Sequence, residues 1–419
     1  MGDVLSMHAA PSGAPAFRKV ALAYALGQVA DWFAEVTLAL VVFRRTGSPL
    51  AAALVFVALR VLPVAGMRWA AGRSLTRLAA LRTLAMLALA LGVGVLPVWA
   101  LLALGIVDGL GSLGGRAGSR AAAVRLLGHG GALRSGNALL NVAFSVAAMA
   151  APVAAGMLVS GLGATAALGA ASAALAAGAC VASRVRIALP PRPRAGATGV
   201  RRALRESGSG RWLAAEIVLL VLFTAAVPVE LPYVIDSLGA GAGGYGALLT
   251  AWGAGMVAGS VVFAALRRID LPLLAAGSTL AVALAYLAMG VSPSLVLAAA
   301  AALLGGVGNG VQWVSAVSWI QQRVPRALAP QLSALLESVA ALAPGAGFLA
   351  GGAAVTLFDP RACLVAGAAF IVAVTAWAVA AALWPGRRPG SRLRRRLEPV
   401  RQPFSYVEPT PLGREPYSG

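Results

Sequence analysis

Charge is scarce in this sequence, and negative charge is the scarcest. Of 419 residues only 11% are charged and 14 are acidic, whereas 59% are hydrophobic and the mean hydropathy is +0.83. A soluble globular protein carries about 25% charged residues, so the composition excludes that class. We expect an integral membrane protein. Its first 16 residues are rich in Gly, Pro and Ala and do not form a cleavable signal peptide.

Cysteine, histidine and nucleotide-binding loops are also nearly absent. The two cysteines, Cys180 and Cys363, lie in apolar sequence, which argues against a disulfide framework or a metal site. His8 and His129 fall outside the core of every predicted span, and no Gly-rich loop ends in Lys-Ser or Lys-Thr. The sequence therefore predicts no metal, no cofactor, no use of ATP and no enzymatic site.

Positive charge is more abundant and is distributed unevenly. Thirty of the 34 Lys and Arg residues, Arg82 among them, fall on one side of the predicted spans; Arg60 lies inside a span, and Arg44, Arg45 and Arg361 lie on the other side. The positive-inside rule makes the crowded side cytoplasmic, which predicts a plasma (inner) membrane protein with both termini in the cytoplasm. No aromatic platform accompanies the arginines, so they are expected to face anionic lipid rather than nucleic acid.

Long apolar runs alternate with the basic loops and have the length of membrane-spanning helices, about 18 to 25 residues. They predict twelve helices near residues 18–43, 48–71, 80–96, 98–124, 133–159, 163–184, 212–236, 243–267, 271–290, 294–322, 329–357 and 361–384. Between the sixth and the seventh helix lies a Pro/Arg/Gly-rich stretch that cannot span a bilayer. The chain is therefore expected to consist of two six-helix halves.

The domain organisation follows from this division. It comprises a disordered cytoplasmic N-terminus at 1–16, an N-terminal six-helix half at 17–184, a cytoplasmic linker at 185–211, a C-terminal six-helix half at 212–384 and a basic, disordered cytoplasmic tail at 385–419. The tail contains RLRRRLEP and is expected to bind anionic lipids. Short Gly and Pro patterns recur in the same order in both halves. Such a duplicated unit places a substrate between the halves near the middle of the membrane.

Four segments carry a resemblance to a known family. They are ADWFAEVTLALVVFRRTGSPLAAALVFVALRVLP at 30–63, LRSGNALLN at 133–141, GAGGYGALLTAWGAG at 241–255 and LLGGVGNGVQWVSAVSWIQQRVP at 303–325. With them the chain resembles the major facilitator superfamily over roughly residues 17–384, specifically its drug, macrolide and siderophore exporters. The resemblance implies an all-α fold of two six-helix halves and the export of a small molecule.

Two motifs of that family are altered in this chain. Exporters of the superfamily carry Gly-Pro-x-x-Gly-Gly in helix five, and here Ala151, Pro152, Ala155 and Gly156 match it with Ala at two Gly positions. The loop between helices two and three normally has an acidic residue that helps to lock the cytoplasmic face. Its counterpart here is Thr76, which follows Gly72 and precedes Arg77.

The first helix has the clearest polar pattern. Tyr24, Gln28, Asp31 and Glu35 follow the spacing 4, 3, 4 and share one face of a helix. A carboxylate in hydrocarbon costs several kcal/mol, about 2.5–3.5 on insertion scales, so two of them one turn apart should face a wet cavity. Tyr24 and Gln28 are candidate substrate contacts, and Asp31 and Glu35 are candidate proton carriers.

Arg60 in the second helix offers an alternative role for Asp31. Counted along two straight helices, Asp31 and Arg60 lie at similar depths. Asp31 is then either half of a structural ion pair with Arg60 or a coupling site. If the pair forms, Glu35 is the freer titrating group.

Other polar residues inside the spans leave similar alternatives. Asp108, with Ser112 and Arg116 on the same helix face, is a second candidate for proton coupling or a packing hydrogen bond. Glu337 is a third, or else pairs with Arg323 or Arg326. Glu216 and Glu230 lie nearer helix ends, where water lowers the cost of charge. Candidate substrate contacts or helix-packing residues are Asn141, Asn309, Gln312 and Trp313.

The sequence thus predicts a secondary active transporter that exports an amphipathic organic compound, such as a drug, antibiotic or siderophore, in exchange for protons or sodium. One alternative is an importer of a small polar metabolite. Another is a membrane scaffold or sensor that no longer transports, which the altered motifs around Thr76 and Pro152 favour.

Overall fold

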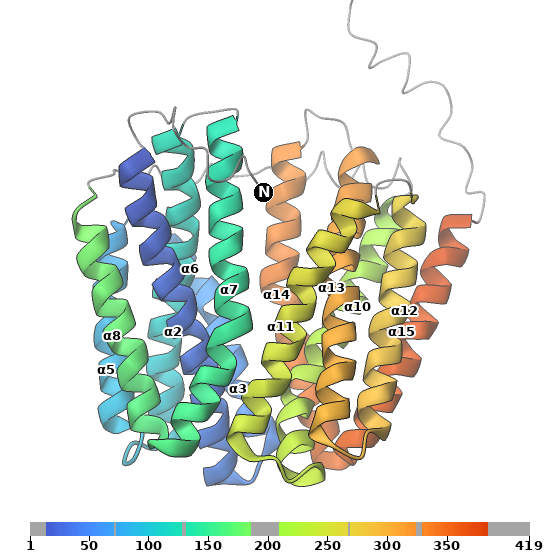
Figure 1. The fold of residues 1–419 in the computed structure, drawn as a ribbon, viewed down its shortest axis with the longest axis horizontal. Helices are drawn as coiled ribbons and strands as arrows, with labels where there is room; N and C mark the ends of the chain where they lie inside the picture. The colour runs from blue at the N-terminus through green and yellow to red at the C-terminus, as the bar shows by residue number, and fades with distance from the viewer. Residues whose placement is uncertain are drawn as a thin grey trace, which may run out of the picture. The chain divides into compact units, whose positions relative to one another are not determined.

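The computed structural model describes residues 14–70, 73–127, 131–185, 209–266, 269–323 and 329–383. The predicted disordered N-terminus before residue 14, most of the linker, the tail and Gly72 lie outside these ranges. Within them the chain is a bundle of long helices (Figure 1). Eleven of these helices are long and apolar enough to cross a membrane, and a further one, α14, is apolar over Leu342–Leu357.

The predicted arrangement of twelve spans in two halves is confirmed. The N-terminal half consists of α2 (Ala14–Thr46), a second span made of α3 (Pro49–Phe56), η2 (Val57–Val61), η3 (Leu62–Gly66) and α4 (Met67–Ala70), then α5 (Leu75–Gly92), α6 (Val98–Leu127), α7 (Gly131–Gly161) and α8 (Gly163–Ser183). The C-terminal half consists of α10 (Ser209–Pro232) with η4 (Tyr233–Ser237), α11 (Gly241–Ala265), α12 (Leu271–Val291), α13 (Leu295–Arg323), α14 (Ala329–Leu357) and α15 (Pro360–Leu383).

The third span differs most from its prediction. It begins at Leu75 rather than near 80, because Ser74 caps it: the Ser74 side chain accepts a hydrogen bond from the backbone N–H of Arg77. The earlier start places Arg82 two turns inside α5, where its side chain is buried. The prediction that Arg82 is one of the basic residues on the cytoplasmic side of the spans is therefore wrong.

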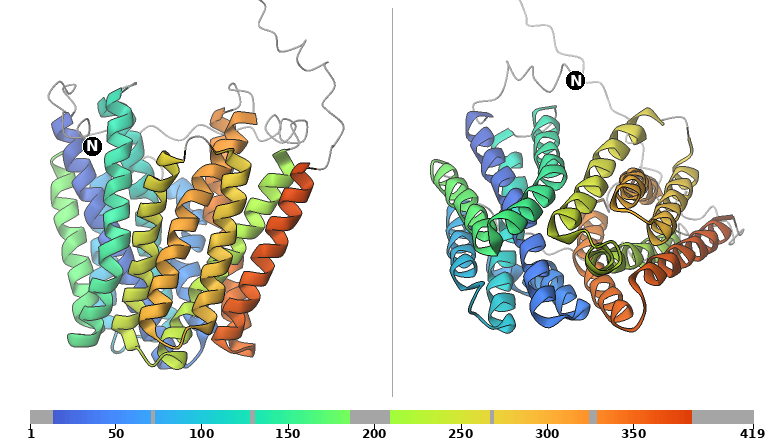
Figure 2. Two further views of the ribbon diagram at one scale, coloured as in Figure 1. Left: turned by 45° about the vertical axis from the view of Figure 1, so that its right-hand side comes forward. Right: turned by 60° about the horizontal axis from the view of Figure 1, so that its bottom comes forward.

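Each half packs mainly against itself. In the N-terminal half α2 contacts α6, α7 and α8, and α5 lies between α6 and α8. In the C-terminal half α13 contacts both α11 and α12, while α10 packs against α14 and α15. The halves meet where α7 lies beside α11 and where α14 lies beside α3 (Figures 1 and 2). Both ends of the described chain, Ala14 and Leu383, lie at one face of the bundle, which we call the terminal face.

The second span is not a regular α-helix. Its middle, Val57–Val61, is a π-helical turn, and Leu62–Gly66 is a 3₁₀ turn. Pro63 accounts for the change. In a regular α-helix its ring would clash with the carbonyl group four residues earlier, and it has no N–H to donate. Gly109 of α6 permits the close approach of this segment: a Cβ there would lie 2.6 Å from the Pro63 ring and nearer still to the Leu59 carbonyl oxygen.

The motif predicted for helix five lies at the contact between the halves. Ala151 and Ala155 are buried, and a Cβ on Gly156 would come within 2.5 Å of the Ala242 carbonyl oxygen of α11. The backbone N–H of Val153 donates to the Thr250 hydroxyl of α11 at 3.1 Å. The small residues around Pro152 therefore let α7 and α11 approach each other closely.

Candidate functional site

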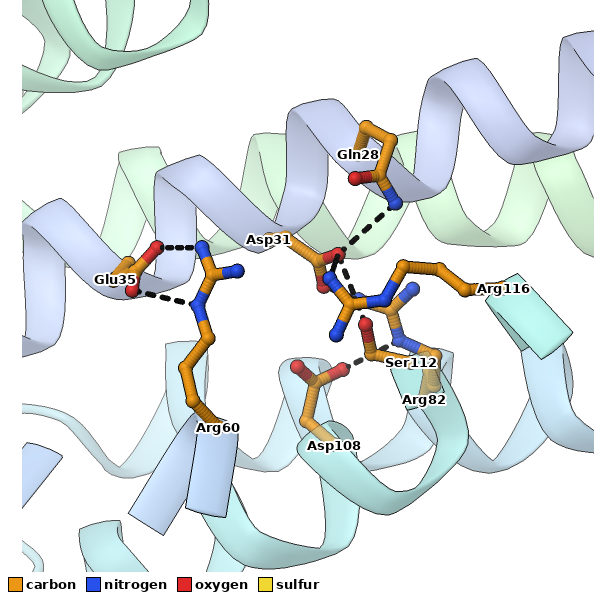
Figure 3. Close-up of polar contacts among 8 residues, drawn as sticks. All are labelled: Gln28, Asp31, Glu35, Arg60, Arg82, Asp108, Ser112 and Arg116. Atoms are coloured by element: carbon orange, nitrogen blue, oxygen red, sulfur yellow. Dashed lines mark hydrogen bonds and ion pairs between the residues drawn. The ribbon is translucent and has the colours of Figure 1, made fainter. Parts of the chain in front are cut away.

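The polar stripe predicted on the first helix is present on α2, and it points into the N-terminal half. Tyr24, Gln28 and Glu35 are buried, and only 11% of the Asp31 side chain is exposed. The Gln28 amide donates to Asp31 at 3.3 Å. The partners of Asp31 and Glu35 come from the second span, α5 and α6 (Figure 3). The stripe is therefore directed at helices of its own half rather than between the halves.

Asp31 is the centre of a charged network of four residues. Arg82 of α5 lies between two carboxylates: its Nη2 is 2.5 Å from Asp31, and its Nε is 2.9 Å from Asp108 of α6. The Asp31 carboxylate also accepts a hydrogen bond from Ser112 at 2.9 Å and faces the Arg116 guanidinium at 3.8 Å (Figure 3). Asp31, Arg82, Asp108 and Arg116, which we call the charged network, carry no net charge when all four are ionised.

Close backbone approach makes room for Arg82 in this network. A Cβ on Gly27 of α2 would lie 3.2 Å from Arg82 Nη1, and one on Gly111 of α6 would collide with the Arg82 side chain. Gly111 therefore makes room for the Arg82 side chain, and Gly27 leaves space beside its guanidinium. Since each charge lies against an opposite one, the cost of burying the ions is offset locally.

Arg60 forms a separate ion pair. Its Nε and Nη2 donate to the two oxygens of Glu35 at 2.9 and 2.5 Å, and its guanidinium lies 5.6 Å from the centre of the Trp32 ring. The predicted Asp31–Arg60 ion pair is therefore wrong, and the condition under which Glu35 would be the freer titrating group is not met. The prediction assumed that the second span is a straight α-helix. The π turn at Val57–Val61 adds one residue to this span, which changes the depth and the rotation of Arg60, and the Arg60 guanidinium meets Glu35, one turn along α2 from Asp31.

Two acidic residues of the C-terminal half are more deeply buried than the sequence suggested. Glu216 is 7% exposed and accepts a hydrogen bond from the Gln312 amide at 2.5 Å. Glu230 is 5% exposed, and within the described residues no hydrogen bond or ion pair reaches it. The expectation that both lie near water is wrong, because α10 with η4 runs from Ser209 to Ser237 and both residues face its packed side.

A tyrosine of α11 lies near acidic residues of both halves. The Tyr245 side chain is fully buried, and its hydroxyl has no hydrogen-bond partner among the described residues. Glu230 and Glu35 both act on it electrostatically. Tyr245 is thus a buried polar group within electrostatic reach of both Glu230 and Glu35.

The remaining predicted residues do not form one site in the described structure. Asn141 of α7 is exposed and Asn309 of α13 is half-buried. Gln312 is buried against Glu216, while Trp313 next to it is 37% exposed, so the two amino acids face different surroundings. Thr76 lies at the start of α5 and Arg77 is exposed. The side chain of Glu337 lies outside the described part of the chain.

A small cavity lies beside the charged network. It has a volume of about 50 Å³ and is enclosed by α2, α5, α6 and α8. Its polar lining comprises Tyr24, Gln28, Arg82, Ser112, Arg116 and Ser119. The two α2 residues that were predicted as substrate contacts therefore line a cavity inside the N-terminal half, and this cavity is large enough only for water.

Comparison with known proteins identifies the fold. No protein-family model matches the chain, and no curated protein matches it. Among solved structures it is similar to a POT family transporter in complex with a thioalcohol-conjugated peptide, with 11% identity, a TM-score of 0.70 and coverage of 87% of this chain and 96% of that one. It is also similar to the nucleoside transporter NupG, with 12% identity, a TM-score of 0.64 and coverage of 87% and 99%.

A third similar structure is a bacterial homolog of the human lysosomal transporter Spinster in an inward-facing conformation, with 16% identity, a TM-score of 0.60 and coverage of 88% of this chain and 96% of that one. At these identities the likeness establishes the fold. The protein is a multi-pass membrane protein with the major facilitator fold, built from two six-helix halves.

Proposed function

We propose that this protein is a secondary transporter that exports an amphipathic organic compound across the plasma (inner) membrane in exchange for protons. In this proposal the terminal face is cytoplasmic, as the distribution of Lys and Arg predicts. The observation that carries the proposal is the charged network, in which one aspartate ties three helices of the N-terminal half together. The fold shared with solved transporters supports it.

Asp31 is the residue proposed to exchange the proton. As a carboxylate it holds α2 to α5 through Arg82 and to α6 through Ser112 and Arg116. A proton on Asp31 removes the charge that attracts both guanidiniums. Arg82 then keeps Asp108, and Arg116 has no other carboxylate within ion-pair distance among the described residues. Protonation therefore changes how firmly α2 is tied to its neighbours, and a transporter can use such a difference to favour one conformation over another.

The substrate is proposed to be amphipathic because of what the facing surfaces offer. Apolar side chains and small residues dominate α7, α11, α3 and α14, the helices that meet between the halves. Trp313 and the half-buried Asn309 of α13 add an aromatic face and an amide. The resemblance of 30–63 and 133–141 to exporters is the reason for proposing outward transport.

Transport of a small polar metabolite is the second candidate. It is favoured by the similar solved structures, whose names refer to a peptide, to 5-aminolevulinic acid and to a nucleoside transporter. A substrate panel should therefore contain amphipathic cations, siderophores, dipeptides and nucleosides.

The test of the proposed function is uphill transport in purified, reconstituted protein. Proteoliposomes with an imposed pH gradient should accumulate an amphipathic compound, and an uncoupler should abolish accumulation. Asp31→Asn should lose accumulation against the gradient but keep exchange of labelled for unlabelled substrate. Arg44→Gln, an exposed change in the last turn of α2, is the matched control and should behave as wild type. Accumulation by Asp31→Asn equal to wild type would refute the role of Asp31.

Orientation is tested separately. Reporter fusions at Gly196 and at Gly419 should be active in the cytoplasm, and a fusion at Ala240 should be active outside it. A fusion at Gly196 that reports from outside the cytoplasm would reverse the assignment of the terminal face and with it the proposed direction of transport.

A further inference from the structure

The cavity inside the N-terminal half reaches from the ends of two helices to the charged network. At one end it is lined by Leu75, in the first turn of α5, and by Ala182, in the last turn of α8, both near the terminal face. At the other end it is lined by Gln28, Arg82 and Ser112, which all contact Asp31. The cavity therefore extends from the level of the first turn of α5 to the side chains that contact Asp31, on the side of α2 that faces α5 and α8.

We propose that this cavity holds water and is the route by which protons travel between the terminal face and Asp31, separate from the path that the substrate takes between the two halves. The proposal rests on the proposed function, because it gives the proton of that function a route. The cavity would thus bind water molecules that pass a proton along.

The walls of the cavity suit water. A volume of about 50 Å³ holds one or two molecules, since a water molecule occupies about 30 Å³ in the liquid, and ordered water needs two to four polar partners. The hydroxyls of Tyr24, Ser112 and Ser119 and the amide of Gln28 supply such partners, and all four residues are at least nine-tenths buried. Apolar contacts alone would leave a cavity of this size dry.

The charges around Asp31 limit the route to one proton at a time. The groups that act on Asp31 are Arg82 from α5, Arg116 from α6 and Arg60 from η2, and Asp108 shares Arg82 with it. Tyr24 on the same helix lies near Arg116 and Arg120. While Asp31 is ionised its charge balances Arg116 at the cavity wall. Once Asp31 binds a proton, the charge of Arg116 is unbalanced and repels the next one.

Gly115 of α6 allows the cavity to be filled without disturbing its walls. It lines the cavity, and a Cβ at this position would meet no atom within 4 Å. Gly169 of α8 is a matched control, because a Cβ there would also meet nothing within 4 Å and Gly169 does not line the cavity. Replacing each by Ala, Val and Leu gives two series that differ only in whether the added side chain enters the cavity.

Two measurements on the full chain in proteoliposomes test the proposal. The first is hydroxyl-radical labelling, which marks side chains beside bound water. Tyr24 should be labelled in the wild type, and labelling should fall severalfold along the Gly115 series but stay constant along the Gly169 series. The second is proton-driven substrate accumulation, whose rate should fall in the same order along the Gly115 series, while exchange of labelled for unlabelled substrate persists and shows that the variants are folded.

Two results would overturn the proposal while leaving the proposed function intact. An unlabelled Tyr24 in the wild type would show that the cavity is dry. Accumulation at the wild-type rate in a Gly115→Leu variant that has lost Tyr24 labelling would show that its water is structural and that protons travel elsewhere. If the wild type moves no protons with substrate, both the proposed function and the proton route are refuted. This outcome is seen in the wild-type measurement and needs no variant.

Discussion

The two halves of the molecule bury acidic residues in different ways. In the N-terminal half Asp31, Asp108 and Glu35 each lie within 3 Å of a guanidinium. In the described part of the C-terminal half Glu216 has only an amide partner, and Glu230 has no hydrogen bond or ion pair. An ionised carboxylate without a cation is costly to bury, and a paired one recovers part of that cost from its partner. Removing one partner of a pair should therefore destabilise the N-terminal half more than neutralising Glu230 destabilises the C-terminal half.

The largest effect is expected from removing Arg82. Arg82→Met leaves both Asp31 and Asp108 without the cation that they share, and breaking a buried pair in this way costs about 3–5 kcal/mol. The folded yield and the unfolding temperature in detergent should fall strongly. Arg77→Met, five residues earlier and exposed, should leave both unchanged. A wild-type unfolding temperature for Arg82→Met would show that the charged network does not stabilise the N-terminal half.

A smaller loss is expected from Asp108→Asn, because Arg82 keeps Asp31 as its partner. The double change Arg82→Gln with Asp108→Asn should be more stable than Arg82→Gln alone, since the one acid that remains, Asp31, still has Arg116 and Ser112. Thermal unfolding of the two single variants and the double variant measures this coupling. Additive losses would mean that Arg82 and Asp108 do not interact.

Glu35→Gln should cost less again, roughly 1–2 kcal/mol, since it removes a hydrogen bond between charged groups. The Arg60 side chain is 29% exposed and lies over Trp32, so its charge can reach a polar environment when Glu35 is neutral. The double change with Arg60→Gln should restore most of the loss in unfolding temperature. If Glu35→Gln lowered the unfolding temperature as much as Arg82→Met does, the Arg60 guanidinium would be as inaccessible to water as the charged network.

The smallest effect on stability is expected in the C-terminal half. Glu230→Gln keeps the shape of the side chain and removes an acid that has no cation beside it among the described residues, so the free energy of unfolding should change by less than the effect of one hydrogen bond, about 1 kcal/mol. Glu230→Lys, which introduces an unpaired cation at the same buried position, is the contrasting variant and should prevent folding. If Glu230→Gln destabilised the protein as much as Asp108→Asn, the contrast between the halves would be lost.

Much of the architecture could be predicted from the sequence. Apolar length and basic loops located all twelve spans, and helical spacing placed Tyr24, Gln28, Asp31 and Glu35 on one face. The same argument aligned Asp108 with Ser112 and Arg116. These successes share a cause, because each depends only on the geometry within a single helix.

The partners of these residues could not be predicted in the same way, because pairing depends on the depth and rotation of one helix against another. Arg82 was missed since the start of α5 was placed five residues too late, although Ser74 before Leu75 is a capping signal that could have located it. Arg60 was paired with the wrong acid because the sequence does not reveal a π turn. Glu230 was misplaced because burial at a helix end depends on the neighbouring helices.

The π turn at Val57–Val61 has a consequence for movement. It is closed by a hydrogen bond from the Leu62 N–H to the Val57 carbonyl, which leaves one more residue in the turn than an α-helix holds. If the segment returned to α-helical register, the chain on one side of it would rotate by about 100° and advance by about 1.5 Å. Arg60 would then swing away from Glu35. The Glu35–Arg60 ion pair therefore holds the π turn of the second span in its present register against α2.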